Sequence, residues 1–304
     1  MQKFIFLMTL FLLFVFLSFS CTQPKLHAPG AEVQLLADGF AFTEGPAADA
    51  EGNVYFTDQP NDRIMKWSID GGVSTFMQPC GRSNGLYFDY DKNLIACADE
   101  KNELWSIAND TTVTVLLSDY QGHLLNGPND VWVHPNRNIY FTDPFYYRPY
   151  WKELRGKMEQ PCQGVYMLSP GGQVTCVIDD LEKPNGIIGT PDGKTLYVAD
   201  IQAQKTYRYA ISEDGSLFNK KLFCRMGSDG MTIDNEGHVY LTGNWVTVFA
   251  SNGAMIAKYY VPENWIANVC FGGKKRDLLF MTASRGVYGL KMRVHGVDSQ
   301  LFLK

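Results

Sequence analysis

Residues 129–143 read Asn-Asp-Val-Trp-Val-His-Pro-Asn-Arg-Asn-Ile-Tyr-Phe-Thr-Asp and hold two short apolar runs on either side of a turn. The runs are rich in β-branched and aromatic residues, and the segment between them, from His134 to Arg137, contains Pro and Asn. Such clusters between such runs are typical of a β-hairpin. The stretch opens on the amide residue Asn129, which stands 11 positions before Tyr140.

The same arrangement recurs along the chain. In six places a carboxylate or amide residue stands 11 or 12 positions before Tyr140 or its counterpart in another apolar run. The polar residues are Glu44, Asn84, Asn129, Asn185, Asp229 and Asn268. Successive members are 40, 45, 56, 44 and 39 residues apart, and a period of roughly 40–50 residues marks an array of equivalent structural units.

Each unit contains further segments that favour strands. A third apolar run follows the hairpin in most units, as in residues 63–67 and 103–107, and a fourth often ends the unit, as in residues 73–76. Six units of four short strands predict an all-β fold, a six-bladed β-propeller, over residues 33–304 as a single catalytic domain. Residues 31–43 are expected to supply the outer strand that closes the last blade.

The longest gap between polar residues, from Asn129 to Asn185, contains an insertion. Residues 143–152 read Asp-Pro-Phe-Tyr-Tyr-Arg-Pro-Tyr-Trp-Lys, which is an unusual density of aromatic side chains. A loop mounted on one face of a rigid scaffold often carries function, so we expect this segment to form a lid or a pocket wall.

The N-terminus has the features of an export signal. Lys3 precedes an apolar run from Phe4 to Phe19, followed by Ser20 and Cys21. This order is typical of a secretory signal, and the run is short for a membrane span, which needs about 20 residues. We predict a signal peptide over residues 1–20, a lipidated linker over residues 21–32, and an exported protein held at a membrane only through Cys21. An ordinary secreted protein and an uncleaved anchor are the alternatives.

Composition narrows the class of partner. The chain has 304 residues, 45% of them hydrophobic, and a formal net charge of -5 without a basic stripe. This composition supports a large core and excludes nucleic acid as an expected partner. Of seven cysteines, six remain once Cys21 is assigned to the lipid. No CxxC pair occurs, so we expect mostly buried free thiols, although export permits one disulfide that the sequence does not choose.

The repeat also predicts a site. In a propeller the first strand of each blade lines the central channel, so the six polar residues are expected to converge near the axis. Glu44, Asn129, Asn185 and Asp229 together offer two carboxylates and two amide oxygens, which suit Ca²⁺, or Mg²⁺ or Mn²⁺ in tighter geometry. No His or Cys is among the six, which disfavours Zn²⁺ without removing it from the alternatives. The competing interpretation is that these side chains only form hydrogen bonds with backbone groups of their own turns.

A second acidic residue recurs in four units, where it ends the second strand of the hairpin. These residues are Asp58, Asp99, Asp143 and Asp200. Because each stands at a strand end, we interpret all four as capping residues.

Several segments resemble the SMP-30/gluconolactonase family, whose members include regucalcin-like lactonases, bacterial gluconolactonases and diisopropylfluorophosphatase-like enzymes. The resemblance covers roughly residues 33–292. The segments that carry it are Glu44-Gly45-Pro46, Asn126-Gly127-Pro128-Asn129-Asp130, Tyr140-Phe141-Thr142-Asp143-Pro144, Lys183-Pro184-Asn185-Gly186 and Ser228-Asp229-Gly230.

The resemblance implies a propeller that binds a divalent cation, often Ca²⁺, at the channel mouth. By position, Glu44, Asn185 and Asp229 match the metal ligands, and Asn129 matches a fourth ligand or a substrate-contacting residue. Asp229 also matches the residue proposed as general base or nucleophile, although a carboxylate bound to a cation has a lowered proton affinity. Asn84, in the same register, is our second candidate for substrate binding.

One departure from the family concerns the substrate. Regucalcin-like members carry an Arg two residues before the Asn129 position, where it binds sugar, and this chain has Gly127 there. The pattern is closer to bacterial gluconolactonases. Arg82, Arg148 and the aromatic residues of 145–151 are the candidates to replace that contact.

The sequence therefore predicts a metal-dependent hydrolase that opens a sugar lactone such as gluconolactone, with Asp229 as the catalytic residue. No Gly-x-Ser-x-Gly segment occurs, which disfavours a serine hydrolase. The alternatives are an organophosphate or aryl ester hydrolase on the same metal site, and a non-enzymatic, surface-tethered propeller that binds a sugar or a protein. We expect a monomer.

Overall fold

The computed structural model describes residues 25–151 and 157–297. The predicted signal peptide and Cys21 lie outside the described residues. Within the described ranges, no helix has the length and apolar character needed to cross a membrane.

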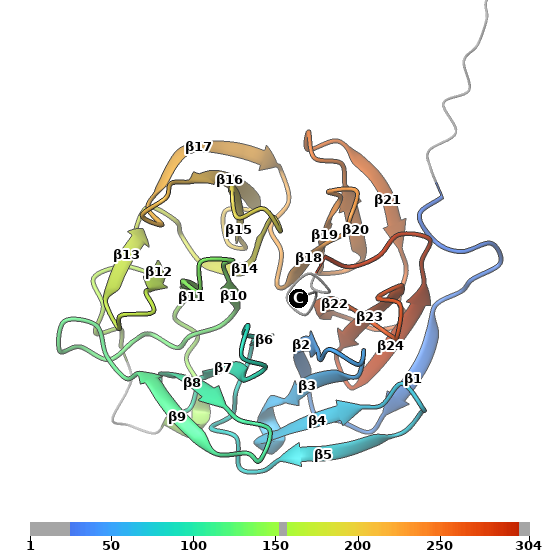
Figure 1. Ribbon diagram of the computed structural model, residues 1–304, viewed down its shortest axis with the longest axis horizontal. Helices are drawn as coiled ribbons and strands as arrows, with labels where there is room; N and C mark the ends of the chain where they lie inside the picture. Colours follow the sequence, from blue (N-terminus) through green and yellow to red (C-terminus); the bar gives the residue numbers. More distant parts are fainter. Residues whose placement is uncertain (1–24, 152–156, 298–304) are drawn as a thin grey trace, which may run out of the picture.

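The described strands form six four-stranded antiparallel sheets, arranged as blades around a central axis (Figure 1). The predicted six-bladed β-propeller is confirmed. From the axis outward, blade 1 contains β2 (Thr43–Ala48), β3 (Val54–Asp58), β4 (Arg63–Trp67) and β5 (Val73–Met77). Blade 2 contains β6 (Leu86–Phe88), β7 (Leu94–Ala98), β8 (Glu103–Ile107) and β9 (Val113–Leu117). Blade 3 contains β10 (Val131–Val133), β11 (Ile139–Asp143), β12 (Gly164–Leu168) and β13 (Val174–Ile178).

The second half of the chain continues the ring in the same order. Blade 4 contains β14 (Pro184–Gly189), β15 (Thr195–Asp200), β16 (Lys205–Ile211) and β17 (Leu217–Cys224). Blade 5 contains β18 (Met231–Ile233), β19 (Val239–Leu241), β20 (Val246–Phe249) and β21 (Met255–Tyr259). Blade 6 contains β22 (Ile266–Gly272), β23 (Leu278–Ala283), β24 (Gly286–Lys291) and, outermost, β1 (Gln34–Asp38). Two short 3₁₀ turns, η1 (Gln59–Asn61) and η2 (Pro149–Trp151), lie in loops.

The ring is closed by the two ends of the chain. β1 pairs antiparallel with β24, so a strand from the N-terminal part completes the C-terminal blade. The predicted outer strand within residues 31–43 is thereby confirmed. Closure leaves the first and last blades packed on each other, as Phe56 of β3 and Phe280 of β23 show with ring centroids 5.9 Å apart.

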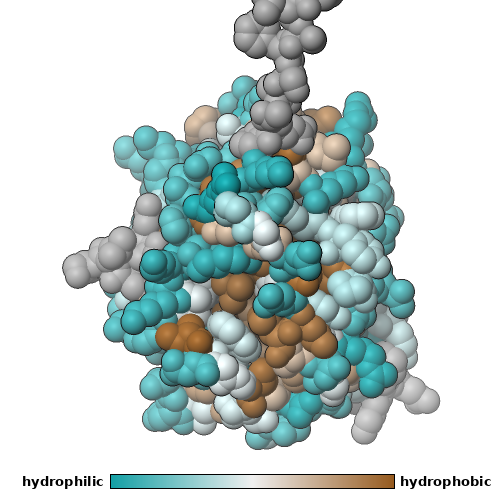
Figure 2. Space-filling view, turned by 90° about the vertical axis from the view of Figure 1, so that its right-hand side faces the viewer, coloured by the Kyte–Doolittle hydropathy of each residue, from teal (hydrophilic) through white to brown (hydrophobic). Residues whose placement is uncertain are grey.

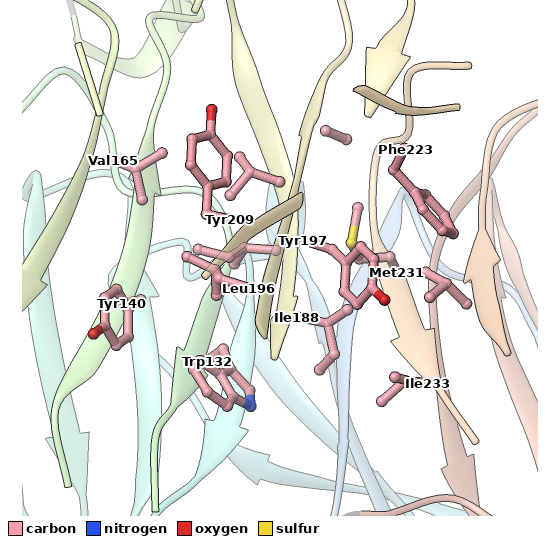
Figure 3. Packing of buried hydrophobic residues seen from close by; sticks show 14 of the residues in the cluster. Trp132, Tyr140, Val165, Ile188, Leu196, Tyr197, Tyr209, Phe223, Met231 and Ile233 are labelled. Carbon is pink, nitrogen blue, oxygen red and sulfur yellow. The ribbon is translucent and has the colours of Figure 1, made fainter. Parts of the chain in front are cut away.

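The inner strands are apolar on both sides because each blade is covered by a neighbour on either face. All five residues of β3 and of β7 are buried. One apolar cluster runs continuously through blades 3 to 5, and Figure 3 shows Trp132, Leu196, Tyr197 and Phe223 packed within it. Burial on both faces makes a strand read as an uninterrupted apolar run, which is why the sequence signal was strong.

The outermost strands face solvent and are mixed in character. Figure 2 views the side that carries β1 and β21, where apolar side chains gather among polar ones. Leu35 of β1 and Met255 of β21 are exposed. Six cysteines fall within the described residues, where none of them forms a disulfide and four are buried.

The channel at the axis is almost filled. Side chains from the innermost strand of every blade leave a cavity of about 30 Å³, which has room for only about two water molecules. A larger cavity lies at the end of the channel where these strands begin.

Candidate metal and substrate site

Five of the six repeated polar residues surround one cavity of about 240 Å³ at that end of the channel. The five are Glu44, Asn84, Asn129, Asn185 and Asp229. Each stands within the first two residues of its blade's innermost strand or two positions before that strand begins. Their convergence follows from the sequence repeat, because equivalent positions of equivalent blades lie at the same height along the axis.

Asn268 does not join this ring, which corrects the predicted register. Tyr140 and its counterparts pair with the residue three positions after the polar residue in five blades. In blade 6, Phe280 pairs with Cys270, only two positions after Asn268. β22 and β23 extend one residue pair further toward their turn, so the spacing alone was misleading. Ala267 occupies the sixth ring position.

Asn268 is instead the counterpart of Asp130, one residue deeper in the channel. The backbone N–H of Asn268 donates to Thr282 Oγ1 at 3.1 Å, as that of Asp130 does to Thr142 Oγ1 at 3.1 Å. Both side chains also accept from the next residue's N–H. The repeat of polar positions thus has a second level, one residue deeper in the channel. Asp130 was not among the predicted site residues, and the signal that could have identified it is the acid directly after Asn129.

The site concentrates negative charge in a buried place. Glu44 is 5% exposed and Asp130 is also 5% exposed. Burial, followed by repulsion from Asp229, holds the pKa of Glu44 well above its ordinary value. Burial also raises the pKa of Asp130 to about 7 and that of Asp229 to about 6. The three raised pKa values mean that the ionised form of each carboxyl group is unfavourable here. A bound cation would stabilise that ionised form.

Asp229 is fixed by donors from two other blades. Trp265 Nε1 donates to one carboxylate oxygen at 2.6 Å, and Asn185 Nδ2 donates to the other at 2.8 Å. These bonds oppose the effect of burial on the pKa of Asp229. Trp265 was missed in the sequence, because it lies in the loop before β22 and belongs to no repeated motif.

The donor set fits a hard divalent cation. Among the described residues no group of three His, Cys, Asp or Glu is arranged to hold a metal ion, so amide oxygens would have to complete the shell. Asn84 Oδ1 is buried and has no hydrogen-bond partner within the described parts of the chain. A buried acceptor without a donor calls for a ligand, an ion or a water molecule. Two carboxylates and several amide oxygens are ligands that Ca²⁺ accepts.

The insertion in blade 3 forms one wall of the cavity. This confirms the expectation of a pocket wall for the described part of residues 143–152, which ends at Trp151. Tyr146 and Arg148 line the cavity, and Tyr146 Oη accepts a hydrogen bond from Asn185 Nδ2 at 3.0 Å. Burial raises the pKa of Tyr146 to about 12, so its hydroxyl stays protonated. Gln59 and Trp265 complete the polar wall.

Asp99 holds this loop in place. Its Oδ2 accepts from Arg148 Nε at 2.7 Å, from Tyr150 Oη at 2.6 Å and from Gln59 Nε2 at 2.9 Å. Trp151 Nε1 donates to the Asp99 carbonyl at 3.1 Å. The interpretation of Asp99 as a strand cap is therefore corrected, because its carboxylate binds side chains of the lid. Arg82 lies outside the cavity, with its guanidinium carbon 4.7 Å from the Tyr150 ring centroid.

The other three acids at strand ends do bind backbone. Asp58 accepts from Ala41 N and Phe42 N, Asp143 from Asn126 N and Gly127 N, and Asp200 from Glu182 N and Lys183 N. Each fixes the loop that leads into an inner strand. The capping interpretation is confirmed for these three, and it explains how the polar ring is positioned.

Comparison with known proteins gives the family. The model of the SMP-30/Gluconolactonase/LRE-like region matches residues 42–285, so the chain belongs to this family. It is 28% identical over 307 residues to the gluconolactonase of Zymomonas mobilis, covering 90% of this chain and 86% of that protein. It is 30% identical over 255 residues to the pentonolactonase XacC of Haloferax volcanii, covering 80% and 81% respectively. The solved gluconolactonase structure from Xanthomonas campestris superposes with a TM-score of 0.82 at 26% identity, covering 90% of this chain and 96% of that one.

Proposed function

We propose that this member of the SMP-30/gluconolactonase/LRE-like family is a divalent-cation-dependent hydrolase that opens sugar lactones. The observation that carries the proposal is the ring of Glu44, Asn129, Asn185 and Asp229 around one cavity, beneath a loop that supplies Tyr146 and Arg148. The named activities of the Zymomonas and Haloferax relatives, on gluconolactone and pentonolactone, support the substrate class.

Glu44, Asn129, Asn185 and Asp229 would hold the cation. When bound, Ca²⁺ or another divalent ion supplies Lewis-acid polarisation of a lactone carbonyl. The residues themselves supply rigidity, since Asp229 is held by Trp265 and Asn185 and Glu44 Oε2 accepts from Gly45 N at 2.8 Å. A site held in this way needs little reorganisation during reaction.

The remaining roles fall to side chains at the cavity wall. Asp229 orients the attacking water and accepts its proton, within the limit that a carboxylate ligated to a cation is a weak base. Asn84 Oδ1, which receives no hydrogen bond from the described residues, accepts a hydrogen bond from a sugar hydroxyl. Asn129 either ligates the cation or contacts the substrate. Tyr146 closes the wall and excludes water from that side.

The test is lactone turnover by the purified protein before and after EDTA, with Ca²⁺, Mg²⁺, Mn²⁺ or Zn²⁺ added back. The substrate panel contains D-glucono-1,5-lactone, a pentonolactone, an aryl ester and a phosphotriester. We expect turnover of the lactones that EDTA removes and one cation restores. Turnover of the phosphotriester alone would show that the site acts on organophosphates. If no substrate were turned over with any cation, the proposed function would be wrong and the alternative of a non-enzymatic propeller would stand.

A further inference from the structure

Two cysteines of blade 3 lie next to each other. The thiols of Cys162 and Cys176 are hydrogen-bonded to one another, although the two residues are 14 positions apart in the sequence. Cys162 stands two residues before β12, and Cys176 belongs to β13, the outermost strand of the blade. Both are partly exposed, whereas the other four cysteines of the described chain are buried.

The hairpin of β12 and β13 brings the two sulfurs together. The strands pair antiparallel with Tyr166 opposite Cys176, and a bulge follows Val165. The Cys176 sulfur lies over Gly164, where an added Cβ atom would stand only 3.1 Å from it. That distance is shorter than ordinary van der Waals contact, so a glycine at this position leaves room for the sulfur. The Cys176 side chain thereby reaches the start of β12, two residues after Cys162.

The surroundings of the pair differ from those of other cysteines. Burial, followed by the nearby Cys162 thiol, raises the pKa of Cys176 to about 12. The neighbours that bear on the pKa values of Cys80, Cys97 and Cys224 are Asp, Ser, Thr or Met residues. Within the described ranges no group of three His, Cys, Asp or Glu is arranged to hold a metal ion. Two adjacent sulfurs without further ligands suit a covalent bond to each other.

Such a bond would fasten the end of the insertion that forms the cavity wall. The Cys162 carbonyl accepts a hydrogen bond from Asn126 Nδ2 at 2.9 Å. The next residue, Gln163, accepts one through Oε1 from Phe145 N at 2.8 Å, which ties the end of the insertion to its beginning. Tyr146, one residue further on, lines the cavity. A link from Cys162 to β13 would therefore join the insertion covalently to the outer strand of its blade.

We propose that Cys162 and Cys176 form a disulfide on reaction with a small disulfide such as oxidised glutathione, and that this bond stabilises the insertion of blade 3. The Cys162 thiolate attacks one sulfur of the oxidant and releases a first thiol, which leaves a mixed disulfide on Cys162. Cys176 loses its proton, attacks the Cys162 sulfur and releases the second thiol. The two cysteines lose two protons and two electrons, and the oxidant gains both. The inference does not depend on the proposed lactonase function.

The test compares oxidised and reduced protein. The purified protein is incubated in mildly alkaline buffer with oxidised glutathione or with dithiothreitol, and the reagent is then removed. Thiols are counted in denaturant, and cross-linked peptides are mapped by mass spectrometry. We expect two fewer thiols after oxidation and a cross-link that joins Cys162 to Cys176. The bond closes a loop of 15 residues, which should raise the melting temperature by about 5 °C over that of the reduced protein.

Three variants isolate this bond. The double variant Cys162→Ser/Cys176→Ser should melt at the same temperature after both treatments, and Cys176→Ser should retain one glutathione on Cys162. Cys224→Ser is the control, because Cys224 is buried in β17 of blade 4, and it should keep the difference in melting temperature. Equal thiol counts after both treatments, a cross-link that joins other cysteines instead, or a melting difference that persists in the double variant overturns the proposal. Peptide mapping of the unsubstituted protein decides the question even where a variant does not fold.

Discussion

Trp265 Nε1 donates a hydrogen bond of 2.6 Å to Asp229 Oδ2, joining the loop before blade 6 to the inner edge of blade 5. The bond occurs where the ring of polar side chains is interrupted, since Ala267 occupies the ring position in blade 6. An indole is a donor only, so it holds a carboxylate without competing for a cation. The sixth blade thus contributes to the site through a side chain outside the repeat.

Replacing this donor should impair the reaction while preserving the fold. Trp265→Phe retains the ring and removes the N–H, and a hydrogen bond to a charged group is worth about 1.5–3 kcal/mol. We expect kcat/KM for a lactone to fall by about tenfold or more with a nearly unchanged melting temperature. Trp245→Phe is the control, because Trp245 is 41% exposed and contacts Tyr260 rather than the site. Equal losses in both variants would contradict a specific role for Trp265.

Removing a carboxylate should abolish cation binding. Glu44→Gln and Asp229→Asn keep the shape of the side chains, and we expect neither to show a calorimetric signal with Ca²⁺ or cation-dependent turnover. Ca²⁺ at about 100 times its Kd should stabilise the unsubstituted protein by about 2.7 kcal/mol and the variants not at all. Without divalent ions Glu44→Gln should melt no lower than the parent, because it relieves the repulsion between Glu44 and Asp229. Unaltered Ca²⁺ affinity in both variants would refute the assigned ligands.

The two levels of the polar repeat should respond differently to truncation. Asn84→Ala removes a side chain that lines the cavity, so we expect a higher KM for a lactone and little change in stability. Asn268→Ala removes an acceptor of the Val269 N–H inside the channel, which should lower the free energy of unfolding by about 1–3 kcal/mol. Urea unfolding and lactone kinetics on both variants make the comparison. A lactone KM that rises only in Asn268→Ala would reverse our assignment.

Asp99 should control the lid rather than a strand end. Asp99→Asn removes the charge beside Arg148 and weakens the bonds to Tyr150 and Gln59. We expect kcat/KM to fall by about tenfold, through Arg148 and Tyr146. Glu100→Gln is the control, since Glu100 pairs with Arg82 at 3.5 Å outside the cavity. Lactone kinetics that stay at the parental level in Asp99→Asn would show that the loop does not depend on this carboxylate.

The N-terminal prediction concerns residues outside the described structure. If Cys21 is the lipidated residue, Cys21→Ser should move the protein from the membrane pellet to the soluble fraction and abolish labelling by a palmitate analogue. The measurement is fractionation of a bacterial host that expresses the full chain. Labelling that persists in Cys21→Ser would reject the lipoprotein assignment.

Local patterns predicted most of the architecture because propeller strands are short and their partners are near in sequence. The runs around Tyr140 and Tyr197 marked hairpins, and the spacing of Glu44, Asn129, Asn185 and Asp229 placed them on equivalent strands. The spacing failed for Asn268, because a longer hairpin in blade 6 moves the register without altering the apparent offset. The acids at strand ends were interpreted correctly where their partners are backbone groups close in the chain.

The amino-acid sequence by itself determined the number of blades, the closing strand and the ring of oxygen-bearing side chains, since all three follow from a repeated local pattern. The tertiary structure alone decided which residues complete the site. Trp265 reaches Asp229 from 36 positions away, and Arg148 reaches Asp99 from 49 positions away. Trp265 and Arg148 lie in loops outside the repeat, and only the closed ring brings both side chains to the wall of the same cavity.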